Sequence, residues 1–281
     1  LGMDDYLQLG FFAALDAINA IVPNRKVHAT GYCLGGTLLA IANAAMARDG
    51  DPRLASMSLF CAQTDFTEPG ELALFIDEGE VSLLEAQMEE TGYLTAGQMA
   101  GAFQLLRSYD LMWSRMVGEY LMGERAPMND LMAWNADTTR MPAKMHKYYL
   151  REFYLNNRLK EANALTIGGE KIDLGQIRVP LYAVGCEEDH IAPWAQTFRI
   201  CNLVSGPARY TLSSSCYILG IVNPPVNPPK RKFWSGDAQR ADSADSWRER
   251  TQPEAGSWWD GWRSWLLPDS GELVAPPGSG N

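Results

Sequence analysis

Apolar and polar residues follow a pattern along the first part of the chain that predicts helix, strand, helix and strand in turn. In the first helix, apolar residues recur at spacings of three and four: Leu7, Phe11, Leu15, Ile18 and Val22. Pro23 ends this helix, a short strand is expected over 26–31, and an Ala- and Leu-rich helix over 37–46 runs to the breaker Asp49–Pro52. A second buried strand is expected over 57–62. Elements in this order predict a parallel α/β sheet.

The pattern changes to helical segments between 67 and 176, for example on one face that carries Trp113, Met116, Val117, Tyr120 and Leu121. A convincing series of strands is absent there, and Gly168–Gly169 is typical of a hairpin turn rather than of a phosphate-binding loop. We interpret 67–176 as a helical cap inserted into an α/β core that 1–66 and 177–267 form together.

The sheet resumes with a strand at 179–184, followed by a helix over 193–203 and a last strand at 209–212. After Val222 the chain is Pro-rich and then Trp-rich. The tail 268–281 ends in a stretch of Pro, Gly and Ser, a composition that predicts disorder.

The composition limits the class of protein. With 281 residues and 46% hydrophobic content, the chain is long enough for one substantial core with an insertion. Its net charge of -10 argues against nucleic acid as the main partner, because phosphate binding needs a concentrated basic face. The sequence shows neither a signal peptide nor an apolar run of about 18 residues, the length that spans a membrane. A soluble cytoplasmic protein is therefore expected.

The five cysteines are widely spaced and include no Cys-x-x-Cys pair: Cys33, Cys61, Cys186, Cys201 and Cys216. This spacing favours reduced thiols over a disulfide framework and argues against a zinc site. We therefore expect no bound metal and no cofactor.

Cys33 lies between the first predicted strand and its helix, in the sequence Gly31-Tyr32-Cys33-Leu34-Gly35-Gly36. A nucleophile flanked by small residues at such a junction is typical of a nucleophile elbow, and Gly31, Gly35 and Gly36 supply the room for the turn. The helix N-terminus is expected to lower the thiol pKa, and the Leu34 N–H is expected to form half of an oxyanion hole. The alternative is a Gly-rich turn with a buried, inert cysteine.

In α/β-hydrolase folds an acid and then a histidine follow the nucleophile, each on a loop after a later strand. Asp189 follows the strand at 179–184 and fits the acid, although a solvated loop carboxylate is the alternative. No histidine occupies 212–216, where the base is expected. The chain has three histidines, and we expect His28 in the core, His146 on the surface and His190 pointing away from Asp189.

The elbow, with Cys in place of Ser, resembles the Gly-x-Cys-x-Gly-Gly motif of polyhydroxyalkanoate synthases. Glu187–Trp194 is similar to the acid loop of that family, and Asn223–Pro225 to the segment after its histidine loop. Further similar segments are Tyr109–Trp113, Leu131–Asn135, Tyr149–Arg151 and Gly256–Trp259. The resemblance reaches from the start of the chain to about Leu267 and is strongest to the class that acts on short-chain substrates. It implies the C-terminal, catalytic half of such a synthase.

The resemblance implies a cysteine acyltransferase with an α/β-hydrolase fold. Cys33 would attack the thioester of an (R)-3-hydroxyacyl-CoA, with 3-hydroxybutyryl-CoA as the favoured substrate, and the polyester would grow from the bound acyl group. Asp189 would assist the histidine or the attacking hydroxyl. A homodimer at the surface of cytoplasmic polyester granules is the expected setting.

Two features depart from the family. Its histidine lies in a Ser-Gly-His-Ile-x-Gly string, where this chain has Cys216 at the glycine and Tyr217 at the histidine. A phenol with a pKa near 10 is a poor base at neutral pH, so we expect little or no activity. The second departure is that few residues precede the elbow, so that strands and the second oxyanion donor upstream are expected to be missing. A fragment that folds poorly alone is therefore expected.

Other functions stay open. A thioesterase or esterase of the same fold would release free hydroxy acid instead of polymer, and Tyr217 favours a catalytically silent subunit bound to a synthase partner or to the granule. The basic run Lys230–Lys232 is read as a solvated loop rather than a CoA-phosphate site. Trp258, Trp262 and Trp265 share a helical face that we expect to pack on the sheet rather than bind polymer.

Overall fold

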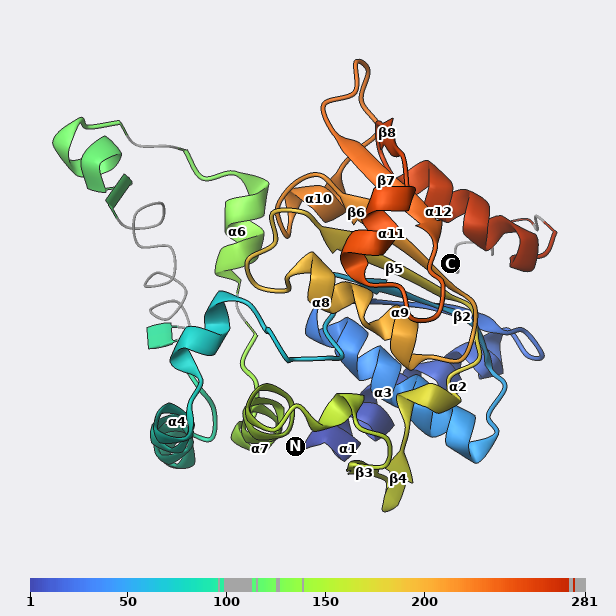
Figure 1. The fold of residues 1–281 in the computed structure, drawn as a ribbon. Coiled ribbons are helices and arrows are strands. Elements are labelled where there is room, and N and C mark those ends of the chain that lie inside the picture. The colour runs from blue at the N-terminus through green and yellow to red at the C-terminus, as the bar shows by residue number, and fades with distance from the viewer. Residues whose placement is uncertain are drawn as a thin grey trace.

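A computed structural model describes residues 1–95, 97–98, 113–114, 116–124, 127–137, 139–272 and 275. A mixed six-stranded sheet lies at its centre, in the order β1-β2-β5-β6-β7-β8, with helices against it (Figure 1). The strands are β1 (Val27–Tyr32), β2 (Leu54–Phe60), β5 (Leu181–Cys186), β6 (Ala208–Ser213), β7 (Lys232–Asp237) and β8 (Pro253–Ala255). Strands β1, β2, β5 and β6 are parallel, which confirms the predicted α/β class.

Helices cover both faces of this sheet. Tyr182 and Tyr210 lie on opposite faces, because Ala183 of β5 is the register partner of Tyr210 in β6 and side chains alternate along a strand. Trp265 packs on Tyr182, and Thr197 contacts Tyr210 through their hydroxyls. The helices of the core are α1 (Met3–Asp5), α2 (Ala13–Ile21), α3 (Leu34–Asp49), α8 (Trp194–Phe198), α9 (Ile200–Leu203), α10 (Leu219–Val222), α11 (Ala244–Arg250) and α12 (Trp259–Leu266), with a π-helical segment at Tyr6–Phe12 and a 3-10 turn at Leu267–Asp269.

The predicted elements before the cap are confirmed with shifted ends. Helix α3 starts at Leu34, three residues before the predicted start, and ends at Asp49; Gly50 follows with a φ of +69°, a left-handed conformation that caps the helix. The first helical stripe is buried only in part: Leu7 and Leu15 are in the core, but Ile18 and Val22 are exposed.

The prediction that the strand near 209–212 is the last one was wrong. Strands β7 and β8 follow it and run antiparallel, β7 against β6 and β8 against β7. Strand β7 is hard to predict because a Pro-rich segment precedes it and its first residue, Lys232, is charged. Its next two residues, Phe233 and Trp234, are both buried.

The segment between β2 and β5 is mostly helical and extends to one side of the sheet (Figure 1). Its elements are η2 (Glu71–Phe75), α4 (Glu78–Thr91), η4 (Met116–Leu121), α6 (Asp130–Ala136), α7 (Ala143–Tyr148), η5 (Tyr149–Leu155), η6 (Arg158–Lys160), β3 (Leu165–Ile167), β4 (Glu170–Ile172) and η7 (Leu174–Gln176). Strands β3 and β4 form a hairpin, which confirms the turn at Gly168–Gly169. The predicted apolar face at Met116 and Tyr120 is exposed to solvent, and most of the similar segment Tyr109–Trp113 lies outside the described residues.

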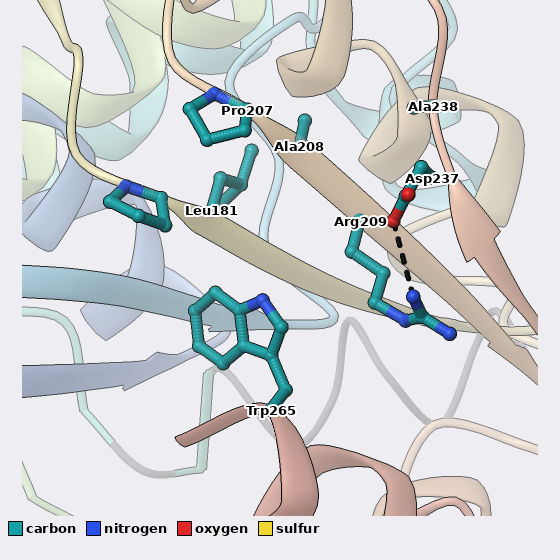
Figure 2. Close-up of a pocket in the computed structure, with 8 residues that line it drawn as sticks. Leu181, Pro207, Ala208, Arg209, Asp237, Ala238 and Trp265 are labelled. Carbon is teal, nitrogen blue, oxygen red and sulfur yellow. Dashed lines mark hydrogen bonds and ion pairs between the residues drawn. The ribbon is translucent and has the colours of Figure 1, made fainter. Parts of the chain in front are cut away.

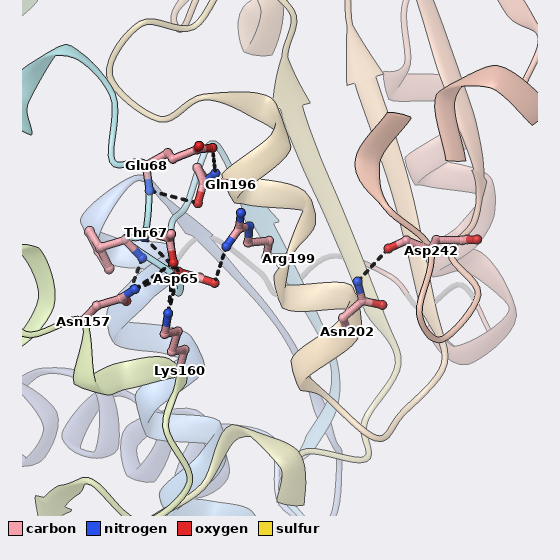
Figure 3. A network of polar contacts seen from close by, with 10 residues as sticks. Asp65, Thr67, Glu68, Asn157, Lys160, Gln196, Arg199, Asn202 and Asp242 are labelled. Atoms are coloured by element: carbon pink, nitrogen blue, oxygen red, sulfur yellow. Dashed lines mark hydrogen bonds and ion pairs between the residues drawn. The ribbon is translucent and has the colours of Figure 1, made fainter. Parts of the chain in front are cut away.

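Asp65 joins this helical segment to the core (Figure 3). It lies just after β2, is almost fully buried, and accepts hydrogen bonds from Thr67, Asn157 and Arg199 at 2.6, 2.9 and 3.0 Å. Burial alone would raise the pKa of Asp65, but these hydrogen bonds outweigh it and lower the pKa to about 2. One charged carboxylate therefore holds segments together that lie far apart in the sequence.

Replacing Asp65 by asparagine is expected to destabilise the fold by about 2–3 kcal/mol at neutral pH, because the change leaves Arg199 without its counter-charge. A carboxyl whose pKa is lowered on folding stabilises the fold above about pH 4, and this contribution is lost as the pH falls toward 2. Urea unfolding at pH 7 and pH 3 measures both effects. The exposed Asp137→Asn variant is the control, and equal stability of the two variants would contradict the assignment.

Candidate active site

Cys33 occupies the junction between β1 and α3 in a strained conformation. Its φ of +54° and ψ of -127° lie in a region that side chains other than glycine rarely adopt, and its N–H donates to the Phe60 carbonyl at 2.9 Å. Strain of this kind, at a strand-to-helix turn, is what a nucleophile elbow requires to expose its side chain. The alternative of an ordinary Gly-rich turn does not account for positive φ at a cysteine.

Two glycines make the elbow possible by close approach. A Cβ at Gly31 would lie 2.5 Å from the Gly36 Cα, and one at Gly36 would lie 2.5 Å from the Ala62 Cβ. At Gly35, by contrast, a Cβ would meet nothing within 4 Å. The expectation that Gly35 is needed for space was therefore wrong, since this residue is exposed on the first turn of α3.

The Cys33 thiol is half-buried, and burial raises its pKa above the usual value of a thiol. A hydrogen bond from Tyr217 and the backbone N–H of Leu34 both act in the other direction, while the charge of Asp189 adds to the rise. The expected lowering of the pKa by the helix N-terminus is thus outweighed by loss of solvent. At neutral pH the thiol is protonated in this structure, so attack on a substrate needs a proton acceptor.

Tyr217 stands beside Cys33 and is no such acceptor. Its ring stacks on Tyr32 with centroids 5.1 Å apart, and the Tyr32 hydroxyl donates to the Tyr217 carbonyl at 3.2 Å. Burial and the nearby Cys33 raise the pKa of the Tyr217 phenol far above its usual value. The phenol is therefore a hydrogen-bond donor to the thiol rather than a base.

Asp189 lies on the loop after β5, with 7% of its surface exposed. Its Oδ1 accepts from the N–H groups of Ile191 and Ala192, both at 2.9 Å, whereas Oδ2 has no hydrogen-bond partner among the described residues. Burial raises the pKa of Asp189, although those two N–H groups and the nearby Cys61 thiol lower it in part. The alternative of a solvated loop carboxylate is excluded by this burial. Oδ1 is held by the backbone, and Oδ2 makes no hydrogen bond of ordinary geometry within the described part of the chain, although the Cys61 thiol lies close enough to stabilise the charge of the carboxyl.

His28 lies too far from Cys33 to serve as its base. His28 precedes it by five residues along extended β1, about 16 Å away, and its Nδ1 contacts the Ser56 hydroxyl at 2.7 Å. His28 is half-buried rather than a full core residue. The prediction that His146 is a surface residue was wrong: it is buried in α7, and burial lowers its pKa. The burial could not be predicted because charged residues flank His146 in the sequence. Lys144 and Lys147 lie on other faces of this short helix.

Four residues near the site were not predicted. Cys61 and Cys186 lie beside each other and near Asp189, and the buried phenols of Tyr149 and Tyr154 lie near Cys33. Burial raises the pKa of Tyr154 to about 12, and the charge of Cys33 adds to that rise. A sequence signal exists for both, since Cys61 lies near the end of the strand predicted at 57–62 and Cys186 follows the strand predicted at 179–184 by two residues.

The tryptophans near the end of the chain hold the loop that carries Tyr217. The Trp258 and Trp259 indoles donate to the Gly220 and Ile221 carbonyls of α10, both at 2.9 Å. Trp262 donates to Ser58 of β2 at 2.9 Å, which confirms that these residues pack on the sheet.

A cavity of about 210 Å³ lies at the opposite end of the strands, between β6, β7 and α12 (Figure 2). Leu181 and Ala208, the first residues of β5 and β6, line it together with Trp265. Arg209 pairs there with Asp237 at 3.1 Å. Cys33 and Asp189 instead follow the carboxyl ends of their strands, so this cavity does not serve the thiol.

Two further findings concern the described part of the chain. Groups of three or more His, Cys, Asp or Glu side chains arranged to hold a metal ion are not found there. Among the same residues, each helix is too short or too polar to cross a lipid bilayer.

Similar solved structures include a hydrolase from Oleispira antarctica. It is 13% identical, with a TM-score of 0.44, and the match covers 79% of this chain and 67% of that one. Another is an alpha/beta fold family hydrolase from Bacillus anthracis str. Sterne, also 13% identical, with a TM-score of 0.39 over 78% of this chain and 71% of that one.

A scan against models of protein families finds no match. Among curated proteins, the poly(3-hydroxyalkanoate) polymerase subunit PhaC of Rhizobium meliloti (strain 1021) is 41% identical over 93% of this chain and 42% of that protein. The poly(3-hydroxyalkanoate) polymerase of Methylorubrum extorquens is 39% identical over 99% of this chain and 46% of its own length. The PhaC subunit of Cupriavidus necator (strain H16) is 36% identical over 99% of this chain and 48% of that protein. The chain is therefore a relative of the poly(3-hydroxyalkanoate) polymerases, which it matches along nearly its whole length and along less than half of theirs.

Proposed function

We propose that the chain carries the thiol site of a polyester synthase, corresponding to the C-terminal half of that enzyme. The observation that supports this most is Cys33 itself, a cysteine with positive φ at the strand-to-helix turn, with Asp189 and Tyr217 on the loops that face it. A cysteine suits acyl transfer from a thioester, because thiol and thioester exchange readily and the bound acyl group stays reactive.

In the proposed reaction the Cys33 sulfur attacks the carbonyl carbon of an (R)-3-hydroxyacyl-CoA. The carbon–sulfur bond to CoA breaks, CoA leaves as a thiol, and the acyl group stays on Cys33. The 3-hydroxyl of another unit then attacks that carbonyl, forms an ester and frees the thiol. The Leu34 N–H, on the first turn of α3 where N–H groups have no partner within the helix, would bind the oxyanion in both steps. The short-chain 3-hydroxybutyryl group is the proposed substrate.

Each attack releases a proton that needs an acceptor. At position 217, where an acceptor is expected, the chain has the phenol of Tyr217. Asp189 has a free Oδ2 that would orient an imidazole at position 217, but Tyr217 holds its own proton instead. We therefore propose a low activity for the chain as it stands. The same observation favours, as a second candidate, a silent subunit that binds a synthase partner or a cytoplasmic polyester granule.

The form of the product tests the reaction class. Incubation with (R)-3-hydroxybutyryl-CoA, at enzyme amounts that compensate for a low rate, is expected to give CoA together with polymer. Cys33→Ala should abolish both, and Cys201→Ala, which changes a buried thiol on α9, should leave both unchanged. Free 3-hydroxybutyrate in place of polymer would identify a thioesterase. CoA release that persists in the Cys33→Ala variant would contradict the assignment of this site. If the unaltered chain itself releases no CoA, the result would support the silent subunit.

A further inference from the structure

Cys61 and Cys186 bring two buried thiols into contact beside the site. Their sulfur atoms lie 3.4 Å apart, and the two residues expose 1% and 0% of their surface. Neither residue takes part in the proposed acyl transfer. A pair of thiols at this distance is different from a lone cysteine, because the two can react with each other.

The sheet fixes this contact. Strands β2 and β5 are parallel neighbours, with Phe60 opposite Val184, and the Cys61 N–H continues the ladder by donating to the Val184 carbonyl at 2.8 Å. Cys61 follows the last residue of β2, and Cys186 is the last residue of β5. Because Phe60 is opposite Val184, Cys61 continues opposite Gly185 and Cys186 lies one residue farther along. Cys61 leaves the regular strand conformation with a φ of +45°. A strand spacing of about 4.8 Å and a rise of about 3.3 Å place diagonal Cα atoms about 6 Å apart, within the range that disulfides join.

The two sulfurs also support both loops that face Cys33. Near Cys61 lies Asp189, and contact with this thiol lowers the pKa of the carboxyl. Cys186 packs under Gly220 of α10, where a Cβ would lie 2.5 Å from its sulfur. Gly220 comes three residues after Tyr217, and its N–H donates to the Cys216 carbonyl at 2.8 Å. A chemical change at the two sulfurs would therefore act on the acid loop and on the Tyr217 loop together.

We propose that Cys61 and Cys186 form an oxidisable dithiol, which a peroxide converts into a disulfide at the base of the active site. This goes beyond acyl transfer and does not depend on it. In the first step one thiolate attacks a peroxide oxygen, the O–O bond breaks, and water leaves after the departing hydroxide takes up a proton. In the second step the other thiol attacks the resulting sulfenic sulfur, the S–O bond breaks, and a second water leaves. The two thiols lose two electrons, which reduce the peroxide.

The reaction is expected to be slow at neutral pH and faster in alkali. Burial raises the pKa of the Cys61 thiol well above its usual value, and only the thiolate reacts with peroxide. Once a sulfenic acid forms, the second thiol is already in contact with it. The two sulfurs then have to close from 3.4 Å to the bond length of about 2.04 Å.

Peptide mapping after treatment with hydrogen peroxide at mildly alkaline pH tests this. The native chain, alkylated and digested without reduction, should give the Cys61–Cys186 peptide pair as its main disulfide. The same chain in concentrated urea should spread its five thiols over about ten pairings, so the pair is expected to be enriched several-fold, up to about tenfold, in the native sample. Cys186→Ser should remove the pair, and Cys201→Ser should leave it unchanged.

Equal yields of the Cys61–Cys186 pair in native and urea-treated samples would overturn the proposal. So would native samples in which Cys33 is oxidised while Cys61 and Cys186 remain free for alkylation after unfolding. No substrate enters this experiment, so its outcome is separate from that of the polymerisation assay.

Discussion

Replacing Tyr217 by histidine, together with Cys216 by glycine, is expected to raise the rate of CoA release from (R)-3-hydroxybutyryl-CoA by about 10²–10⁴-fold at pH 7. The phenol at position 217 keeps its proton, because burial and Cys33 raise its pKa. An imidazole has a pKa near 6.5, so it accepts the thiol proton at neutral pH. The free Oδ2 of Asp189 would orient the ring and stabilise its charged form.

The matched control is Tyr217→Phe with Cys216→Gly, which restores the glycine and removes only the phenol hydroxyl. Its rate of CoA release is expected to stay within a few-fold of that of the unaltered chain. Both rates can be followed by trapping the released CoA thiol with a chromogenic disulfide, with Cys33→Ala as the blank. An unaltered chain that releases CoA as fast as the histidine variant would refute the assignment of Tyr217 as the defect.

Most of the α/β core could be predicted from the sequence, because buried parallel strands are short apolar runs bounded by Gly, Pro and Asp. The strands at 26–31, 57–62 and 179–184 are all present within about two or three residues. Strand β7 was missed because it lies near the edge of the sheet, where polar residues such as Ser235 and Asp237 are tolerated. Local pattern alone does not distinguish such a strand from a loop.

The residues of the candidate site could be predicted from the sequence, but the direction of their pKa shifts could not. Cys33 and Asp189 follow from the order of strands and loops, and Tyr217 follows from comparison with the family motif. The direction of the Cys33 pKa does not follow from the motif, because burial of the thiol depends on segments distant in the sequence, such as those that carry Tyr149 and Tyr217. The same is true of His146, whose burial is set by packing against the rest of the protein.

Alkylation of Cys33 by iodoacetamide is expected to become tenfold faster with each pH unit up to a midpoint above pH 9. Burial raises the pKa of this thiol, and only the thiolate is alkylated, so the reactive fraction at pH 7 is small. Tyr217→Phe should move the midpoint higher still, because the phenol hydrogen bond stabilises the thiolate. Tyr217→His should move it well below that of the unaltered chain, because an imidazolium beside a thiolate stabilises the ion pair.

Quantitative mass spectrometry of the Cys33 peptide over a pH series measures all three midpoints, and it needs no substrate. Cys201 is the internal control, since its buried thiol should stay unmodified as long as the chain is folded. A midpoint below about pH 8 in the unaltered chain would mean that the N-terminus of α3 and the Tyr217 hydroxyl outweigh burial. Cys33 would then be an activated nucleophile without histidine, and the low activity proposed for this chain would need another cause.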